Sequence, residues 1–418
     1  MRSGTQFGTQ LGTRLLQQAD DLARFTQDDS RLTRTYLTPQ HRQAGDYLLA
    51  LMRDAGMQAD YDALGNVVGR YAGLTPDAPV IMSGSHLDSV VDAGKYDGLF
   101  GILTAIACVH DLNARAVRLP HAIEVIGFGD EEGVRFNVTM VGSAAMSGHF
   151  DPAWLEMADD TGLSMRDAIG RFGGHADGWP TLKRDFSRVA CFVESHIEQG
   201  PVLLDAGLPV GVVTAIAGCT RVKVSVCGLA GHAGTVPMPG RRDALAAAAE
   251  MALAVEQLAQ ARAPDIVATV GKFSVAGGGA VNVIPGHVEF SIDLRSGDDA
   301  QRLDAIQTLH DKLAGIAQRR RVEFTWAPYY ALTASPCAPS LQKRMADAIA
   351  AHGVSVKHLP SGAGHDAMQF APVTPTAMLF VRCGNGGISH NPLETLTAQD
   401  AEIATSVLLH FIEHFARP

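Results

Sequence analysis

The stretch Gly84-Ser85-His86-Leu87-Asp88-Ser89-Val90 follows the apolar residues 79–82. That apolar run predicts a buried strand, so a histidine and a carboxylate lie where a core strand opens into a loop. Lys95-Tyr96-Asp97-Gly98 soon adds a second carboxylate. Imidazole and carboxylate groups are common zinc ligands, and one carboxylate can bridge two metal ions. The alternative is a surface loop with a solvated histidine, so the remaining ligands must be sought elsewhere in the chain.

The composition is that of an ordinary soluble globular protein. Of 418 residues, 46% belong to the hydrophobic set and 19% are charged, which suits two domains or one large one. A net charge of −10 argues against a nucleic-acid partner, because binding to phosphates needs basic patches. Residues 1–18 contain no apolar signal-peptide core, and no run of ~18 apolar residues occurs, so we expect a cytoplasmic protein without a membrane span. The six cysteines form no Cys-x-x-Cys pair and are expected to be reduced core residues.

Hydrophobic periodicity predicts alternating helices and strands over most of the chain. Helices are expected at residues 15–25, 44–52, 99–112, 139–146, 340–351 and in a last segment ending at 415. Strands are expected at 80–83, 123–128, 189–193 and 378–381, with a hairpin at 58–71, and residues 152–187 are expected to be a weakly patterned surface excursion. This order predicts an α/β sheet with helices on both faces, which binds its ligands at the carboxyl ends of the strands.

The pattern changes after residue 210. Strands are predicted at 221–227, within 266–275, at 288–294 and at 322–327, with helices at 243–261 and 300–319. The order β-α-β-β-α-β is that of a ferredoxin-like unit. We therefore expect a domain at 212–330 inserted into a catalytic domain made of residues 1–211 and 331–418. The exposed helices and edge strand of the insert are candidates for a symmetric dimer contact.

Two further strand ends carry polar side chains. Residues 123–128 lead into Asp130-Glu131-Glu132-Gly133, where one carboxylate can bind a metal while its neighbour accepts a proton. A solvated acidic turn is the alternative. Residues 189–193 lead into Glu194-Ser195-His196, and a histidine in such a place is often structural. The Gly-rich stretch 361–367 contains no P-loop lysine, which argues against nucleotide binding.

These loops, together with a loop after residues 378–381 that carries His390, provide a set of metal ligands. Divided around a shared Asp97, the set makes two incompletely filled sites with open positions for water and substrate. Asp88 is placed to hydrogen-bond the far nitrogen of the His86 ring and fix its tautomer, and Glu131 is free to act as a base. The predicted ligands are His86, Asp97, Glu132, His196 and His390.

From about residue 44 to 415 the chain resembles the hydantoinase/carbamoylase amidase family, which belongs to the dinuclear metal aminoacylases and aminopeptidases. The Glu-x-His-Ile-Glu-Gln-Gly segment favours the amidase branch over the peptidase branch. The matching motifs, in order, are Gly-Ser-His86-Leu-Asp88-Ser, Tyr-Asp97-Gly, Glu131-Glu132-Gly, Ser-His196-Ile-Glu-Gln199-Gly, Gly231-His232-Ala-Gly, Val-Asn282-Val-Ile-Pro, Asp-Leu-Arg295, Gly364-His365-Asp366 and Ile-Ser-His390-Asn.

The resemblance implies a site with two zinc or manganese ions in each subunit of a homodimer, and Glu131 as general acid and base. It implies that His232 donates to the developing oxyanion and that Arg295 clamps the substrate carboxylate, for which a strand-end salt bridge is the alternative. The further substrate contacts that the resemblance implies are Asn282, Gln199, Gly364 and His365.

The implied reaction is hydrolysis of a linear ureido C–N bond in a small anionic substrate, with release of ammonia and carbon dioxide. Residues 31–37 and 361–366 favour allantoate as the substrate. N-carbamoyl-L-amino acids and ureidoglycolate are the alternatives, because enzymes for these substrates share most of the motifs. An inactive metal-binding relative would be a different class of protein, and the intact Glu131 speaks against it.

Overall fold

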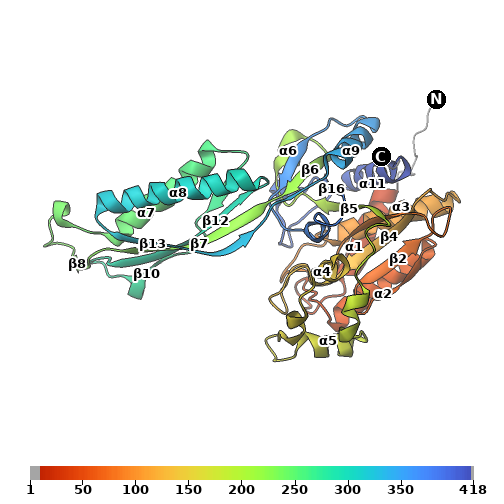
Figure 1. The fold of residues 1–418 in the computed structure, drawn as a ribbon, viewed down its shortest axis with the longest axis horizontal. Coiled ribbons are helices and arrows are strands. Elements are labelled where there is room, and N and C mark those ends of the chain that lie inside the picture. Colours follow the sequence, from red (N-terminus) through yellow and green to blue (C-terminus); the bar gives the residue numbers. More distant parts are fainter. Residues whose placement is uncertain (1–9, 416–418) are drawn as a thin grey trace. The chain divides into compact units, whose positions relative to one another are not determined.

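A computed structural model describes residues 10–415, so residues 1–9 of the stretch inspected for a signal peptide lie outside the described range. Within that range the chain folds into two compact units (Figure 1). The first comprises residues 10–214, 337–359 and 363–415, and the second comprises residues 215–336 and 360–362. The second unit thus extends beyond residue 330, the expected end of the inserted domain at 212–330, and it also includes residues 360–362. These residues join it through a hydrogen bond from the N–H of Ala217 to the carbonyl of Ser361.

A mixed sheet organises the first unit, and nine strands of it lie among the described residues. Their order is β1-β2-β4-β3-β5-β16-β6-β14, with β15 also paired to β6. The central strands β4, β3, β5 and β16 are parallel, and the predicted hairpin of β1 and β2 is confirmed. The strands are β1 (Gln58–Tyr61), β2 (Val67–Tyr71), β3 (Val80–His86), β4 (Ala122–Phe128), β5 (Val189–Ile197), β6 (Val210–Ile216), β14 (Ser335–Pro336), β15 (His358–Ser361) and β16 (Thr376–Val381).

Helices cover both faces of this sheet, as predicted. Successive side chains of a strand point to opposite faces, so Cys191 and Val193 of β5 join one core while Phe192 points the other way. Phe192 stacks on Phe370 of α10 (Ala367–Phe370) with ring centroids 4.3 Å apart, and α4 (Val141–Ser147) packs against α10. The helices of the first core are α1 (Leu11–Ala23), α2 (Pro39–Asp54), α3 (Leu99–Ala114), α9 (Pro339–Ala351) and α11 (Ala398–Glu413).

Most of residues 152–187 are exposed or half-buried, as expected of a surface excursion, but the segment contains a helix that was not predicted. This helix is α5 (Met165–Phe172), which begins where the Ser164 hydroxyl accepts a hydrogen bond from the N–H of Asp167. Ile169 and Phe172 are buried in a second hydrophobic cluster, which also holds residues that follow the acidic turn, such as Phe136. A helix of eight residues gives only two turns of periodicity, which is too short a pattern to stand out in the sequence.

The second unit has the predicted ferredoxin-like arrangement. Its antiparallel sheet has the order β10-β12-β7-β13, and β9 pairs with β12. Helices α7 and α8 cover one face of this sheet (Figure 1), and buried side chains alternate along β12 accordingly. Its elements include β7 (Gly218–Cys227), β8 (Gly231–His232), α7 (Ala244–Ala261), β9 (Val267–Thr269), β10 (Phe273–Val275), β11 (Val283–Ile284), β12 (His287–Ser296), α8 (Asp299–Arg320) and β13 (Glu323–Leu332).

The structure also bears on two expectations drawn from composition. None of the helices within residues 10–415 combines the length and the apolar character needed to cross a bilayer. All six cysteines are free thiols, and five of them are buried as predicted. Cys227 is the exception: it is the last residue of β7, and its side chain is exposed.

Candidate active site

The central parallel strands bring two histidines and the acidic turn to one edge of the sheet. Strand β3 lies between β4 and β5, so the carboxyl ends of all three are neighbours. His86 is the last residue of β3, and His196 lies within β5, whereas the sequence placed both on loops. The apolar pattern stops at Met82 and Val193, but the backbone ladder continues through the polar residues because its hydrogen bonds do not depend on side-chain polarity.

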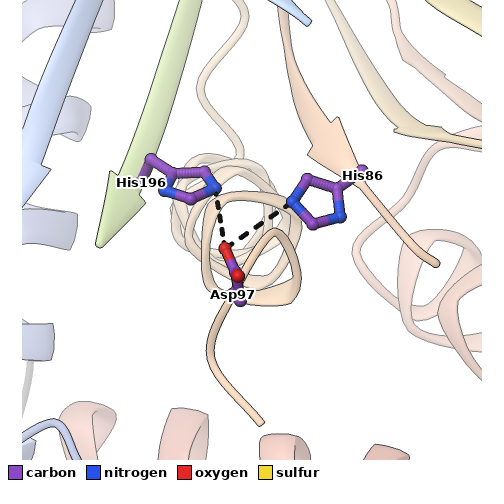
Figure 2. A group of neighbouring side chains, drawn as sticks. All are labelled: His86, Asp97 and His196. Carbon is purple, nitrogen blue, oxygen red and sulfur yellow. Dashed lines mark ion pairs between the residues drawn. The ribbon is translucent and has the colours of Figure 1, made fainter. Parts of the chain in front are cut away.

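Asp97 stands on the loop that leads into α3, and both imidazole rings point toward it (Figure 2). Its Oδ1 lies 3.3 Å from Nε2 of His196 and 3.7 Å from Nε2 of His86. All three residues are buried. The next residue, Gly98, has φ +67°, and a Cβ there would lie 2.5 Å from the His86 ring. A glycine is therefore required for this loop to pass so close to the histidine.

The other carboxylate oxygen of Asp97 faces a second pair of side chains. Oδ2 lies 3.1 Å from Nε2 of His390, which is 3.7 Å from Oε1 of Glu132. The ligand atoms of His86, Asp97 and His196 lie within 4.8 Å of one another, and so do those of Asp97, Glu132 and His390. The structure therefore brings all five predicted ligands together as two groups that share Asp97.

The residues of these groups fit divalent cations. Within residues 10–415, Nε2 of His196 and Oε1 of Glu132 are buried without a hydrogen-bond partner, which is costly unless something binds them. Burial raises the pKa of Glu132 to about 7, and burial together with the neighbouring Glu132 and Asp366 raises the pKa of Glu131 well above its ordinary value. Burial would raise the pKa of Asp97 too, but the surrounding histidines hold it well below its ordinary value. Cations would supply the positive charge that these carboxylates lack.

Asp88 acts differently from the prediction. Nδ1 of His86 lies 3.0 Å from the backbone carbonyl oxygen of Asp88, so the main chain contacts the ring. The Asp88 carboxylate accepts hydrogen bonds from the N–H of Glu131 at 3.1 Å and of Glu132 at 3.2 Å. The chain turns after β3 so that this side chain reaches the end of the neighbouring β4. The backbone thus orients His86, and the Asp88 side chain fixes the acidic turn.

Gln199, Gly364 and His365 also lie near the ligands. Nε2 of Gln199 donates to both carboxylate oxygens of Asp97 at 3.2 Å. A Cβ on Gly364 would lie 3.9 Å from Oε1 of Glu131, so this glycine borders the predicted base. The His365 ring is buried and packs edge-on against His196, with centroids 4.4 Å apart. His365 is therefore the neighbour of a ligand and lines no exposed surface.

His232 and Asn282 are neighbours within the second unit. Strands β8 and β11 pair there, and the N–H of Ala233 donates to the carbonyl of Asn282 at 2.9 Å. Both side chains are exposed. The N–H of Gly234 donates to Nδ1 of His232 at 3.0 Å. Because Nδ1 accepts that bond, the neutral His232 ring carries its proton on Nε2 and can donate it to a ligand.

Arg295 lies on β12 of the second unit and is already paired. Its Nε donates to Oδ1 of Asp293 at 2.8 Å, and its Nη1 donates to the carbonyl of Gly362 at 2.7 Å. The pair with Asp293 is the strand-end salt bridge expected as the alternative to a substrate clamp. A substrate carboxylate bound bidentately by Arg295 would have to replace part of these contacts.

Three buried carboxyl groups lie beside the ligands although no role was predicted for them from the sequence. Glu194 accepts from the Ser85 hydroxyl at 2.7 Å, and burial raises its pKa to about 8. Asp366 accepts from the Ser143 hydroxyl at 2.5 Å, and burial raises its pKa to about 7. The third is Glu394, which is 3% exposed. Glu194 shares a face of β5 with the residue two positions on, His196, so strand periodicity could have found it, whereas Glu394 follows no local pattern.

Known proteins are similar to this chain over nearly its whole length. The model of peptidase family M20/M25/M40 matches residues 82–414. The chain is similar to an N-carbamoyl-L-amino acid amidohydrolase of Geobacillus stearothermophilus, 40% identical over 407 residues, which cover 97% of this chain and 99% of that protein. It is also similar to an allantoate deiminase of Arabidopsis thaliana. The two are 38% identical over an alignment of 426 residues, and the match covers 94% of this chain and 80% of that protein. The crystal structure of a hydantoinase/carbamoylase family amidase from Burkholderia multivorans matches with a TM-score of 0.90 at 33% identity over 96% and 97% of the two chains.

Proposed function

Because this chain belongs to peptidase family M20/M25/M40, and within it to the hydantoinase/carbamoylase amidases, we propose that it hydrolyses a linear ureido C–N bond in a small carboxylate substrate. The chain is thus a hydrolase that acts on C–N bonds. The observation that carries the proposal is the pair of ligand groups that share Asp97, with Glu131 beside them.

We assign two divalent cations to these groups. Zinc and manganese both suit a mixture of imidazole and carboxylate donors. When bound, such cations polarise a carbonyl oxygen and make water a stronger acid. The residues that would hold them are His86, Asp97, Glu132, His196 and His390.

Glu131 is the proposed general base and acid. One of its carboxylate oxygens lies within 4.8 Å of the ligand atoms of both His86 and Glu132. It takes the proton of the attacking water and passes it to the leaving nitrogen. The water oxygen bonds to the ureido carbon, the C–N bond breaks, and the carbamic acid fragment decomposes to carbon dioxide and ammonia. Asp88 holds the main chain of the acidic turn, so that Glu131 and Glu132 can serve separate roles.

The second unit supplies the substrate contacts in this proposal. The Nε2–H of His232 donates to the developing oxyanion, which its tautomer supports. Arg295 exchanges part of its pairing with Asp293 for the substrate carboxylate, and Asn282, beside His232, contributes a polar side chain. Gln199 and Gly364 border the reacting carbon from the first unit. We propose further that the chain works as a homodimer in which the second unit closes over the substrate.

Allantoate is the first candidate substrate, in line with residues 31–37 and 361–366. An N-carbamoyl-L-amino acid is the second candidate, because the relative that is 40% identical carries that activity in its name. Ureidoglycolate stays a third. All three compounds contain both a ureido group and a carboxylate. Arg295 could therefore bind the carboxylate, and Glu131 could act as the base, with any of them.

The proposal is tested by measuring ammonia released by zinc- or manganese-loaded protein from allantoate, ureidoglycolate and N-carbamoyl-L-amino acids. A dipeptide, followed by its newly exposed amine, completes the panel, and the Glu131→Gln protein is the matched control. We expect ammonia from a ureido compound and no dipeptide cleavage. Cleavage of the dipeptide without release of ammonia from any ureido compound would refute the proposal.

A further inference from the structure

Glu394 lies behind the second ligand group, in contact with two loops that carry ligands. Its Oε1 accepts hydrogen bonds from the backbone N–H of Tyr96 at 2.8 Å and of Asp97 at 3.2 Å. Its Oε2 accepts from the Ser389 hydroxyl at 2.8 Å. Ser389 directly precedes His390, and its hydroxyl also lies 3.5 Å from Oδ2 of Asp97. A single carboxylate thus bonds the loop of Asp97 and the loop of His390.

The surrounding structure is shaped to admit this carboxylate. The Glu394 side chain is almost fully buried. A Cβ at Gly94 would lie 2.3 Å from Cδ of Glu394, so any larger residue at that position would displace the carboxyl group. The contact joins residues 298 positions apart along the chain, so neither local sequence nor one element of secondary structure accounts for it. Tertiary packing therefore places Glu394 so that it links two loops that lie far apart in the sequence.

Among the described residues, Glu394 belongs to none of the groups whose ligand atoms lie close enough together to hold one metal ion. Both carboxylate oxygens of Glu394 are occupied by N–H and O–H donors of the protein. In contrast, Glu132 Oε1 is buried without a hydrogen-bond partner in the described part of the chain, as a ligand atom should be. The donors to Glu394 include the main chain of Asp97 itself, so losing them would free the peptide that carries the shared ligand.

We propose that Glu394 is a positioning residue for the ligand group of Asp97, Glu132 and His390. It ties the Asp97 loop to the His390 loop and so holds Oδ2 of Asp97 facing Nε2 of His390. The inference rests on the proposed function only in that the group holds a cation. Residues that orient metal ligands typically change metal affinity about 10–100-fold when they are removed. Glu394 contacts the loops of both Asp97 and His390, whereas it reaches the group of His86 and His196 only through Asp97, so that group should be affected less.

The test measures metal binding and does not depend on turnover. Zinc is added to metal-free wild type, Glu394→Ala, Glu394→Gln and Ser389→Ala proteins in competition with a chromogenic chelator, and bound metal is counted by mass spectrometry. Glu402→Gln, which changes a half-buried glutamate of α11, is the matched control. The free energy of unfolding of each metal-free protein is measured alongside.

We expect Glu394→Ala to weaken the binding of one of two zinc ions by about 10–100-fold and that of the other by less. Glu394→Gln keeps one acceptor oxygen and should reduce the affinity for that ion less. Ser389→Ala should lose only the hydrogen bond between Glu394 and the His390 loop. Wild-type affinity for both ions in Glu394→Ala, or an equal loss of both that follows the loss of stability, overturns the inference. Should Glu394→Ala not fold, wild-type affinity in both Glu394→Gln and Ser389→Ala overturns it as well. Wild-type protein that binds no zinc refutes the proposed function instead.

Discussion

Changing Glu131 to glutamine separates proton transfer from metal binding. The substitution keeps the size of the side chain and leaves its backbone N–H bonded to Asp88, so the acidic turn should stay in place. What is lost is the carboxylate that accepts a proton. Removing a general base typically costs about 10²–10⁴ in rate, which corresponds to roughly 3–5 kcal/mol of transition-state stabilisation. Glu131 is 9% exposed, which leaves little room for bulk water to replace it.

The assay follows ammonia release at saturating substrate, with metal content measured on the same samples. We expect kcat to fall by about 10²–10⁴ while the metal content matches wild type. Glu132→Gln is the matched control, because it removes a proposed ligand from the adjacent position and should lower metal content. A Glu131→Gln protein that stays active, or that loses its metal while Glu132→Gln keeps it, refutes the assignment of the two carboxylates.

Four further predictions follow from the same structure. His390→Ala should reduce bound metal toward one ion per chain, because one of the three donors of its group is lost, and unchanged content in metal analysis of the dialysed protein would contradict that ligand role. Mixing inactive Glu131→Gln and His232→Ala proteins should restore activity if His232 acts across a dimer, since each heterodimer then has one intact site; no recovery after subunit exchange shown by native mass spectrometry would assign His232 to its own chain. Asp88→Asn should lower metal affinity and kcat by about 10–100-fold, because an amide keeps only one acceptor for the two N–H groups of the acidic turn, and wild-type values in both assays would show that the carboxylate is dispensable. The contribution of His41 to stability should fall as the pH drops from 6.5 toward 3, because burial lowers the pKa of His41 to about 3 and the unfolded chain binds the proton first; compared with wild type, His41→Leu should therefore lower the slope of unfolding free energy against pH, measured in urea, by up to about 1.4 kcal/mol per pH unit, and identical slopes would contradict the prediction.

Local pattern was enough to predict the architecture and to single out the five proposed ligands that the structure brings together. Helix α3 is strongly apolar, the strand before His86 is buried throughout, and the strand before His196 is buried from Cys191 onward, so their composition was clear. Parallel neighbouring strands then place their carboxyl ends at one edge, which is why ligands far apart in the sequence meet. The ferredoxin-like order of the second unit followed from the same reasoning.

Contacts that depend on backbone conformation or on long-range packing could not be predicted. Asp130, Gln199 and His390 all have positive φ, an uncommon conformation for residues other than glycine that no hydrophobic pattern signals. The role of Asp88 depends on how the chain turns after β3, which sends its carboxylate to the next strand end. Glu394 meets Asp97 only through tertiary packing, so its sequence neighbours give no indication of the contact.

The central claim is that this chain hydrolyses ureido carboxylates with two divalent cations held by the groups around Asp97. The most direct test is to titrate zinc or manganese into metal-free protein while following ammonia release from allantoate and from an N-carbamoyl-L-amino acid. The account predicts that the rate rises with added metal and levels off at two equivalents per chain. Full turnover in the metal-free protein, or no ammonia from either compound at two equivalents, would contradict it.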